Sequence, residues 1–463
     1  MYDLAVIGAG SAGFSAAITA AEQGVRVALI GRGTIGGTCV NVGCVPSKTL
    51  IRVAETLHQA HAAQRFAGIH ARARVTDWQA VAAQKDALVN ELRQAKYVNL
   101  LSEYDSIDYL DGPARLTPDG VAVNGELIES NRIIVATGSS PTVPPIPGLE
   151  AVSFLTSTTA MALERLPSSL LVIGAGYVGC ELAQMFARMG VKVTILCRRR
   201  LLPETEPEIG EALARCFRDE GIDVLSGLSY REVRASSSGV AVSVVREGAT
   251  GIIEAERLLN ATGRHANTAG LRLDQADVEL TTNGGIRVNE HLRSTNPKIY
   301  AAGDVTGAHQ FVYMAAYGAR IAAENALNGD ARVYDASAMP SVVFTDPQVA
   351  SVGLTEADAR AEGREVQTST LPLSAVPRAL AARDTRGLIK LVAERVNGRL
   401  LGAHILAPEG GDSIQTAVLA IKHGLTVIDL AETIFPYLTT VEGLKLAAQT
   451  FNKDVSKLSC CAG

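Results

Sequence analysis

Residues 4–13 read LAVIGAGSAG, and this stretch decides the fold of the chain. The apolar run Leu4–Ile7 is typical of a buried strand, and the glycine-rich turn 8–13 leads into a helix predicted over Phe14–Gln23. A second strand is predicted over Val25–Ile30. This order of strand, GxGxxG turn and helix indicates dinucleotide binding. The glycines allow the backbone to approach a pyrophosphate, whose charge meets the positive end of the helix dipole.

The same layout returns at residues 170–179, LLVIGAGYVG. A strand is predicted over Leu170–Ile173, a helix over Glu181–Met189 and a further strand over Val191–Leu196. A GxGxxG motif alone also occurs in ordinary glycine turns before helices, but here strand, turn and helix are all in place. The duplication therefore predicts two dinucleotide-binding units. Their candidate cofactor-binding glycines are Gly8, Gly10, Gly13, Gly174, Gly176 and Gly179.

Two strands that end in Ala-Thr-Gly bracket the second unit, in IIVATGSSP (133–141) and LLNATGRHA (258–266). They are interpreted as crossings between two nested domains. After Asp335 the pattern changes to strands and helices that indicate an α+β domain. The predicted fold class is therefore α/β, with two nested Rossmann-like domains and a C-terminal α+β domain. The predicted domains are 1–145 with 265–335, 146–264, and 336–463.

The composition is that of an ordinary soluble globular protein, with 47% hydrophobic and 20% charged residues among 463. The net charge is −5 and no basic block is present, which argues against nucleic acid as a partner. No apolar run is long enough for membrane insertion. The sequence passes directly into a predicted strand without a secretory signal, and seven cysteines are too few for a secreted disulfide scaffold. We expect a cytoplasmic protein.

Four of the seven cysteines form two pairs, Cys39 with Cys44 in GGTCVNVGC and Cys460 with Cys461 in LSCCAG. The first pair follows the dinucleotide fingerprint, which suggests a dithiol that exchanges electrons with a flavin. The second pair lies near the end of the chain, where packing rarely requires cysteine. Together the pairs indicate redox chemistry on a soft metal ion, because soft thiolates select soft metals.

The spacing of Cys39 and Cys44 is unfavourable for a disulfide in a regular helix. Five residues along a helix separate the Cα atoms by roughly 8–9 Å, whereas a disulfide needs less than about 7 Å. Bridging therefore requires a distorted turn, for which Gly43 supplies backbone freedom, and the resulting bond is strained and reducible. The predicted helix start near these residues should lower a thiol pKa. The alternative is a pair of buried, reduced cysteines.

Cys460 and Cys461 are adjacent, so their Cα atoms lie about 3.8 Å apart. This is shorter than the usual disulfide range, and the two thiols should remain available as a metal-binding pair. The alternative is a pair of tail thiols without a role.

The residue that ends the second strand of a Rossmann unit reads the ribose, where an acid favours a 2′-hydroxyl and arginine favours a 2′-phosphate. In the second unit this position is Cys197, followed by Arg198, Arg199 and Arg200. This favours NADPH over NADH, and the alternative is a solvated basic turn.

In the first unit the position that contacts the ribose is Gly31, where an acid is expected. Gly31→Glu should therefore tighten flavin binding or leave it unchanged.

The two GxGxxG motifs, GGTCVNVGCVPSK (36–48), ATGR (261–264) and YAAGD (300–304) resemble the pyridine nucleotide-disulfide oxidoreductase family over essentially the whole chain. The tail from residue 435, with its vicinal cysteines, resembles the branch of that family that reduces Hg(II). The resemblance implies FAD in the domain 1–145 with 265–335, NADPH in the domain 146–264, and a dimerisation domain at 336–463, in a homodimer whose active sites use both chains. Hg(II) and small thiols are the implied partners, and mercury detoxification is the implied function.

The resemblance also implies roles for individual residues. Lys48 and Glu181 are expected near the isoalloxazine, and Tyr177 is expected to cover the nicotinamide pocket. Cys44 is expected to face the flavin and Cys39 the substrate. Members of the Hg(II)-reducing branch often carry an additional amino-terminal CxxC domain; the sequence contains none, and we expect metal to arrive directly at the core. The implied FAD-contacting residues are Gly8, Gly10, Gly13, Gly33, Thr38, Lys48, Ala114, Asp304 and Val312.

Relatives that reduce disulfides carry a histidine five residues before a glutamate, as a proton shuttle to the leaving thiol. Before Glu442 this position is Tyr437, and tyrosine is a poor shuttle at neutral pH. Tyr437 and Tyr97 match two tyrosines that line the metal path in the Hg(II)-reducing branch. Each also fits a core aromatic with a satisfied hydroxyl.

The sequence thus predicts NADPH-dependent reduction of Hg(II) to Hg(0) through FAD and the Cys39–Cys44 dithiol. Hg(II) is expected to reach this dithiol from Cys460 and Cys461 of the partner subunit. A lipoamide or glutathione disulfide reductase is one alternative, and a non-catalytic, metal-sequestering flavoprotein is another. Other residues are expected to be structural: core or surface thiols at Cys180, Cys197 and Cys216, a packed strand histidine at His404, and solvated arginines at Arg378, Arg383 and Arg386.

Overall fold

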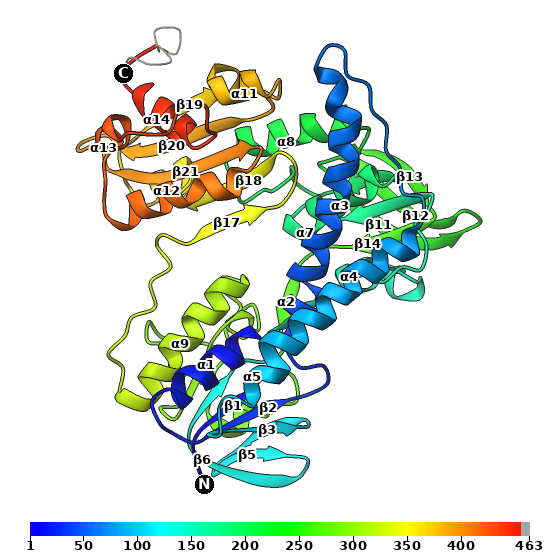
Figure 1. Ribbon diagram of the computed structural model, residues 1–463. Coiled ribbons are helices and arrows are strands. Elements are labelled where there is room, and N and C mark those ends of the chain that lie inside the picture. The colour runs from blue at the N-terminus through cyan, green and yellow to red at the C-terminus, as the bar shows by residue number, and fades with distance from the viewer. Residues whose placement is uncertain (455–463) are drawn as a thin grey trace. The chain divides into compact units, whose positions relative to one another are not determined.

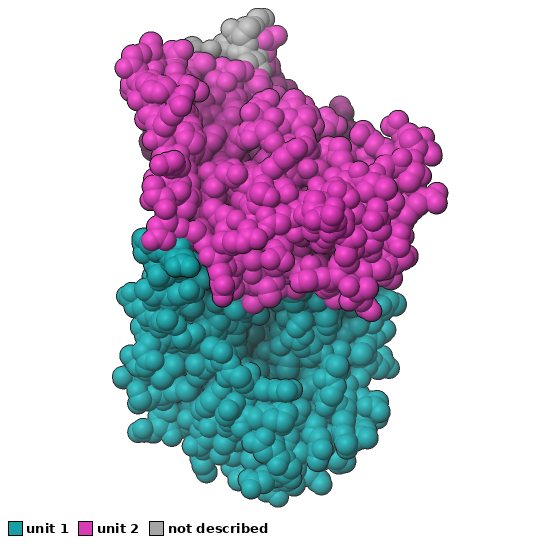
Figure 2. Space-filling model, turned by 90° about the vertical axis from the view of Figure 1, so that its right-hand side faces the viewer, with its two compact units in different colours: residues 1–49, 79–142, 263–335 teal, residues 50–78, 143–262, 336–463 magenta. Residues whose placement is uncertain are grey.

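The computed structural model of the protein describes residues 1–454, which divide into two compact units (Figures 1 and 2). Unit 1 consists of Met1–Thr49, Gln79–Thr142 and Gly263–Asp335. Unit 2 consists of Leu50–Trp78, Val143–Thr262 and the chain from Ala336 onward. The α/β fold class expected from the sequence is confirmed, while the three cofactor-based domain boundaries stay a prediction.

Unit 1 is built on a seven-stranded sheet in the order β3-β2-β1-β6-β5-β4, with β16 also paired to β6. The strands β1, β2, β3, β6 and β16 pair in parallel, and β4 and β5 form an antiparallel extension. The apolar run Leu4–Ile7 is almost completely buried, as expected for a central parallel strand. The strands are β1 (Tyr2–Ile7), β2 (Val27–Gly31), β3 (Ile107–Asp111), β4 (Ala114–Thr117), β5 (Gly120–Val123), β6 (Glu126–Val135) and β16 (Ile299–Ala301).

The main helices of unit 1 are α1 (Ser11–Ala21) and α9 (Val312–Asn328), which lie side by side (Figure 1). Both helices present small side chains to a shared core, including the fully buried Ala16 and Ala319. Small side chains allow the two helix backbones to approach closely. The remaining elements around this core are α2 (Gly37–Val42), the beginning of α3 (Cys44–Ala62), α4 (Trp78–Arg93), a π-helical turn η2 (Gln94–Val98), α5 (Asn99–Leu101), β7 (Ser139–Pro141) and β15 (Arg264–Ala266).

Unit 2 contains the second strand–turn–helix repeat. Its parallel sheet has the order β10-β9-β8-β14, and a separate antiparallel sheet has the order β11-β12-β13. The duplication predicted from the two GxGxxG motifs is therefore present in the fold, whereas the antiparallel sheet was not predicted. The elements are β8 (Ser169–Ile173), α7 (Tyr177–Arg188), β9 (Lys192–Leu196), α8 (Pro207–Asp219), β10 (Asp223–Leu225), β11 (Ser229–Ser236), β12 (Gly239–Arg246), β13 (Ala249–Ala255) and β14 (Arg257–Asn260).

The C-terminal part of unit 2 is an antiparallel sheet in the order β17-β18-β21-β20-β19. Helix α12 packs against β18 and β21, and α14 packs against β19 and β20. Among residues 1–454, no helix has both the length and the hydropathy needed to span a bilayer. The elements are β17 (Pro340–Val343), β18 (Gln348–Gly353), α10 (Glu356–Ala361), β19 (Val366–Pro372), α11 (Pro377–Ala381), β20 (Leu388–Glu394), β21 (Leu400–Ala407), α12 (Gly410–Lys422), α13 (Val427–Glu432) and α14 (Glu442–Gln449).

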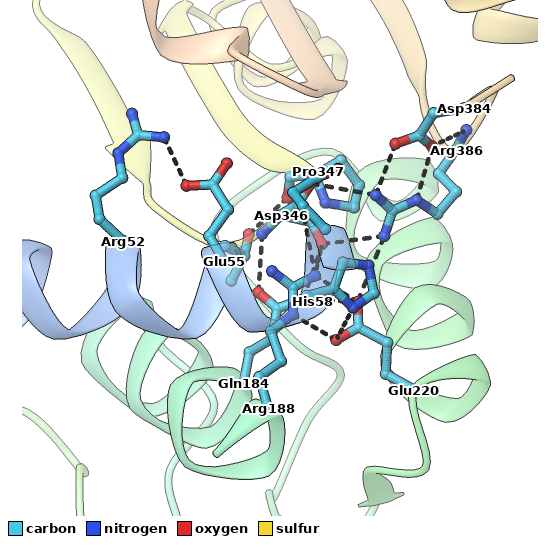
Figure 3. A network of polar contacts seen from close by, with 12 residues as sticks. Arg52, Glu55, His58, Gln184, Arg188, Glu220, Asp346, Pro347, Asp384 and Arg386 are labelled. Carbon is cyan, nitrogen blue, oxygen red and sulfur yellow. Dashed lines mark hydrogen bonds and ion pairs between the residues drawn. The ribbon is translucent and has the colours of Figure 1, made fainter. Parts of the chain in front are cut away.

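A largely buried ionic network inside unit 2 connects these parts (Figure 3). The Arg188 guanidinium of α7 donates two hydrogen bonds of 2.7 Å to Glu220, directly after α8, and lies 3.0 Å from the Asp346 carboxylate. Arg386 contacts the same two acids and also donates to Asp384 at 2.7 Å. The expectation that Arg386 is solvated is therefore wrong, because Glu220 and Asp346, which are distant in sequence, place two more carboxylates around it besides that of Asp384.

We predict that Arg188→Met destabilises the protein by about 3–5 kcal/mol, the usual cost of removing one partner of a buried ion pair. The reason is that Glu220 and Asp346 lose a cation whose side chain is only 6% exposed. Urea unfolding followed by circular dichroism measures the loss. Arg287→Met is the control, since the Arg287–Glu279 pair is exposed and should contribute less than about 1 kcal/mol. Equal effects of both substitutions would contradict the prediction.

Candidate active site

The first glycine motif of unit 1 forms a tight cradle between β1 and α1. A β-carbon on Gly8 would collide with the Ala136 carbonyl oxygen, and one on Gly13 would collide with the Gly8 carbonyl oxygen. A β-carbon on Gly37 would lie 2.5 Å from the Gly10 Cα atom, so the Cys39-bearing segment also approaches the motif closely. No side chain caps the start of α1, whose N-cap is Gly10. This bare helix start fits a pyrophosphate.

The second glycine motif builds the equivalent cradle in unit 2. A β-carbon on Gly174 would collide with the Ala261 carbonyl oxygen, and one on Gly179 would collide with the Gly174 carbonyl oxygen. By contrast, the space beside Gly176 is open to 4 Å among the described residues, so a ligand can approach the backbone there. Gly176 is also the N-cap of α7, again without a side-chain cap. The residues therefore fit a second dinucleotide.

Two side chains at the start of α7 contact the β17 segment of unit 2. Glu181 is buried and accepts a 2.9 Å hydrogen bond from the Phe344 backbone N–H. Burial raises the pKa of Tyr177, and a hydrogen bond with Ser341 opposes this shift. Lys48 belongs to unit 1, so its expected meeting with Glu181 at a flavin stays a prediction, as does the role of Tyr177 as a cover of the nicotinamide pocket.

The three consecutive arginines after β9 have different surroundings. The Arg198 guanidinium lies over the Tyr230 ring, 5.7 Å from its centroid, and the exposed Arg199 donates to the exposed Glu204 at 2.6 Å. Arg200 instead donates to three backbone carbonyls of the following loop, those of Leu202, Pro203 and Thr205. Arg200 therefore stabilises the loop, and Arg198 and Arg199 remain the candidates for a 2′-phosphate.

The cysteine pair lies at a break between two helices. Helix α2 ends at Val42, α3 begins at Cys44, and Gly43 between them has φ −123° and ψ −111°. A β-carbon on Gly43 would lie 2.8 Å from the Thr38 carbonyl oxygen and 3.2 Å from the Cys39 Cα atom. The distorted turn expected from the spacing is therefore present, and it depends on a residue without a side chain.

In the structure Cys39 and Cys44 are thiols joined by a hydrogen bond. This hydrogen bond raises the pKa of Cys39, burial raises it further, and the charge of Lys48 acts in the opposite direction. The expectation that a helix start lowers the thiol pKa is therefore wrong for Cys39. A second negative charge beside a first is unfavourable, so the pair resists losing both protons.

Tyr97 lies beside this dithiol, on the π-helical turn η2. Its ring packs edge-on against Phe14 with centroids 4.9 Å apart, and its hydroxyl lies 3.2 Å from the Ser11 hydroxyl. Burial raises the pKa of Tyr97, and the hydrogen bond with Ser11 opposes this shift. Unit 1 thus brings Tyr97 to the cysteines, while its satisfied hydroxyl also fits a packing role; a place on the metal path stays a prediction.

Tyr437 lies in unit 2 between α13 and α14, and half of its surface is exposed. The neighbouring Glu442 is buried and accepts a 3.2 Å hydrogen bond from the Leu438 backbone N–H. Cys460 and Cys461 lie outside the described residues. Within residues 1–454, no three His, Cys, Asp or Glu side chains gather as a metal site.

Sequence reasoning missed a polar relay around the predicted FAD contact Asp304. Ser139 donates to the Asp304 carboxylate at 2.6 Å, and Arg264 donates to the Ser139 hydroxyl at 2.7 Å. The three residues come from the ATGS, ATGR and AAGD segments, each of which follows a strand. The three motifs can be recognised in the sequence. The hydrogen bonds between their residues cannot, because they depend on the pairing of β7 with β15.

The remaining predicted FAD contacts all lie in unit 1. Gly33 has a φ of +79° and open space beside it, Thr38 lies in α2, Ala114 begins β4 and Val312 begins α9. The interpretation of the remaining thiols as core residues is supported: Cys180, Cys197 and Cys216 are buried, and burial raises the pKa of Cys197 and that of Cys216 to about 11. His404 is a packed strand residue, as expected.

Comparison with family models identifies the class of the protein. Residues 2–323 match the pyridine nucleotide-disulphide oxidoreductase model, and residues 339–448 match the dimerisation domain of the same enzymes. The chain belongs to the pyridine nucleotide-disulphide oxidoreductase family. This family implies FAD and a pyridine nucleotide as cofactors, and the dimerisation domain suggests a homodimer.

Within the family, the chain groups with the mercuric reductases. It is 48% identical to mercuric reductase of Lysinibacillus sphaericus, over 100% of this chain and 85% of the relative. It is 49% identical to that of Streptomyces lividans, over 100% of this chain and 98% of the relative. A similar solved structure is the HOCl-induced flavoprotein disulfide reductase RclA from Escherichia coli, with a TM-score of 0.85, 34% identity, and coverage of 97% and 99% of the two chains.

We predict that Arg199→Ala weakens NADP⁺ binding by about tenfold or more, because a charge-assisted hydrogen bond to a phosphate is lost. Binding of NAD⁺, which lacks the 2′-phosphate, should change little. Isothermal titration calorimetry of both nucleotides measures the difference. Arg215→Ala, at an exposed position on α8, is the matched control. Equal weakening of NADP⁺ and NAD⁺ would show that Arg199 does not read the phosphate.

Proposed function

We propose that this protein reduces Hg(II) to Hg(0) with electrons from NADPH, by way of FAD and the Cys39–Cys44 dithiol. The observation that carries this proposal is the dithiol at the Gly43 break, in a chain that is 48–49% identical to mercuric reductases over its full length. The overall reaction is balanced: NADPH and Hg(II) yield NADP⁺, H⁺ and Hg(0). The biological role that follows is mercury detoxification.

The two cradles support an assignment of one dinucleotide to each unit. FAD is assigned to unit 1, because Gly8, Gly10 and Gly13 leave a bare helix start close to the cysteine-bearing turn. NADPH is assigned to unit 2, where Arg198 and Arg199 follow β9. When bound, these groups supply two electrons as a hydride from the nicotinamide to the flavin and from there to the site. The Ser139–Asp304–Arg264 relay holds the Asp304 carboxylate in place for the flavin.

Cys39 and Cys44 supply the metal-binding sulfurs. Thiols bind Hg(II) as thiolates, so each sulfur releases its proton when the metal binds. The hydrogen bond with Cys44 disfavours ionisation of Cys39 beforehand, and the Lys48 charge favours release of the Cys39 proton. Reduction of the bound ion removes its positive charge, and neutral Hg(0) then leaves because it binds thiolates weakly.

Delivery of the metal is assigned to Cys460 and Cys461 of the partner subunit. Exchange of one thiolate for another keeps Hg(II) coordinated on its way inward, which avoids burying a bare charge. Tyr97 and Tyr437 are proposed to line this path. The dimerisation domain supports a homodimer, and the sharing of sites between chains is part of the proposal. A reducing cytoplasm is the expected location, because it keeps both pairs as thiols.

A disulfide reductase is the second candidate. It is supported by the similarity to the flavoprotein disulfide reductase RclA, which is 34% identical to this chain. Tyr437 argues against this candidate, because it stands where such enzymes place a histidine to protonate the leaving thiol. A non-catalytic, metal-sequestering flavoprotein is the third candidate, and the complete pair of cradles argues against it. NADPH oxidation with oxidised glutathione or lipoamide as the electron acceptor would indicate a disulfide reductase, and no oxidation with any acceptor would indicate the non-catalytic flavoprotein.

We predict that Cys39→Ala and Cys44→Ala each lower Hg(II)-dependent NADPH oxidation by more than about a thousandfold, since catalytic groups that act as a unit are lost together. NADPH absorbance at 340 nm is followed with Hg(II) and an excess of a small thiol. Cys216→Ala, a buried thiol outside the site, is the control. Wild-type oxidation of NADPH with lipoamide or oxidised glutathione, and none with Hg(II), would overturn the assignment.

We predict that Cys460→Ala/Cys461→Ala mainly impairs turnover when an external thiol competes for the metal. With the tail pair removed, Hg(II) must pass directly from the small thiol to the Cys39–Cys44 dithiol. The measurement is turnover as a function of thiol excess over Hg(II), compared with the wild-type protein. Identical thiol dependence of the two proteins would exclude the tail from delivery.

A further inference from the structure

The ribose-reading position of unit 1 is occupied by a residue without a side chain. Strand β2 ends at Gly31, the place from which an acid usually contacts the adenosine ribose of a dinucleotide. A glycine there makes no side-chain contact with a ribose. If unit 1 binds FAD, as the proposed function requires, another group must supply the ribose contact or the contact is lost.

The space in front of Gly31 is filled by Tyr109 of the neighbouring strand β3. A β-carbon on Gly31 would lie 2.5 Å from the Tyr109 hydroxyl oxygen and 2.9 Å from the ring atom Cε2. It would also lie 2.8 Å from the β-carbon of Ala9, which belongs to the GAGSAG turn. The Tyr109 hydroxyl therefore sits where a side chain of residue 31 would begin, next to the pyrophosphate cradle.

The strand register explains how Tyr109 reaches this position. Leu29 pairs with Tyr109 and Gly31 pairs with Asp111, so Tyr109 and Asp111 point to the same face of the sheet as Gly31. The tyrosine ring leans along β3 toward the carboxyl ends of the parallel strands, the edge at which dinucleotides bind. A side chain at position 31 would prevent this, and Gly31 permits it.

The Tyr109 hydroxyl is placed to bind a ligand. Among residues 1–454 no side chain or backbone group forms a hydrogen bond with it. Burial and the charge of Asp111 raise the pKa of Tyr109, so the hydroxyl keeps its proton at neutral pH. A protonated phenol both donates and accepts a hydrogen bond, as a partner for a ribose hydroxyl must.

We propose that Tyr109 replaces the missing acid and hydrogen-bonds the 2′-hydroxyl of the adenosine ribose of FAD, with Gly31 making room for its ring. Gly31 and Tyr109 then act as a pair. The expectation that Gly31→Glu leaves flavin binding unchanged or tightens it does not hold on this geometry, because the new side chain would displace Tyr109 and press on Ala9.

The test compares FAD with its 2′-deoxyadenosine analogue in the full-length protein, with affinities from the quenching of flavin fluorescence. The wild-type protein should bind the analogue about tenfold more weakly than FAD, the loss of one well-made hydrogen bond. Tyr109→Phe should bind FAD about tenfold more weakly than wild type and should bind both flavins equally. Tyr104→Phe removes an exposed hydroxyl of the same unit and should behave as wild type.

A second pair of variants tests the packing part of the proposal. Gly31→Glu should weaken FAD binding, and Gly31→Glu/Tyr109→Val should restore it, because the smaller side chain vacates the space. Wild-type affinity of Tyr109→Phe for FAD, or unchanged discrimination between the two flavins, would overturn the role of Tyr109. Failure of the wild-type protein to bind FAD at all would instead refute the cofactor assignment of unit 1.

Discussion

Contact of backbone with backbone, without a side chain between, is the constraint on which the structure depends. At Gly8 and Gly13 the turn of the first motif packs against its own carbonyl and that of Ala136. At Gly43 two helices approach so closely that Thr38 leaves no space for a β-carbon. The first contacts create a bare helix start for a pyrophosphate, and the last brings two sulfurs within hydrogen-bonding reach. A larger residue at Gly8 or Gly13 would disturb the helix start, and one at Gly43 would disturb the cysteine pair.

The chemistry of the dithiol follows from this enforced proximity. Two thiols that share a hydrogen bond resist forming two adjacent thiolates, and the raised pKa of Cys39 expresses that resistance. A divalent soft cation removes the penalty, because it replaces both protons and neutralises both sulfurs. In the proposed reaction Hg(II) replaces both protons at once, so the arrangement that disfavours two adjacent thiolates does not oppose binding of the divalent ion.

The parts of the fold that sequence predicts are those governed by local pattern. Leu4–Ile7, the two GxGxxG turns and the break at Gly43 follow from residues close together in the chain, and the structure has all of them. The ionic network around Arg188 and the relay around Asp304 were not predicted. Each depends on a pair more than 100 positions apart, Arg188 with Asp346 and Ser139 with Asp304, and no local pattern indicates which distant residue will face which.

The three arginines after β9 show why the same residue type does not carry one function. Arg200 donates hydrogen bonds to three loop carbonyls, and Arg199 forms an exposed ion pair with Glu204. The Arg198 guanidinium lies over the Tyr230 ring. A guanidinium already bonded to backbone carbonyls cannot turn to a phosphate without leaving those carbonyls unsatisfied. An exposed ion pair costs little to exchange for a phosphate. Of the three arginines, Arg198 and Arg199 could therefore turn to a 2′-phosphate at little cost and Arg200 could not, so the number of positive charges in the run overstates what is available for nucleotide choice.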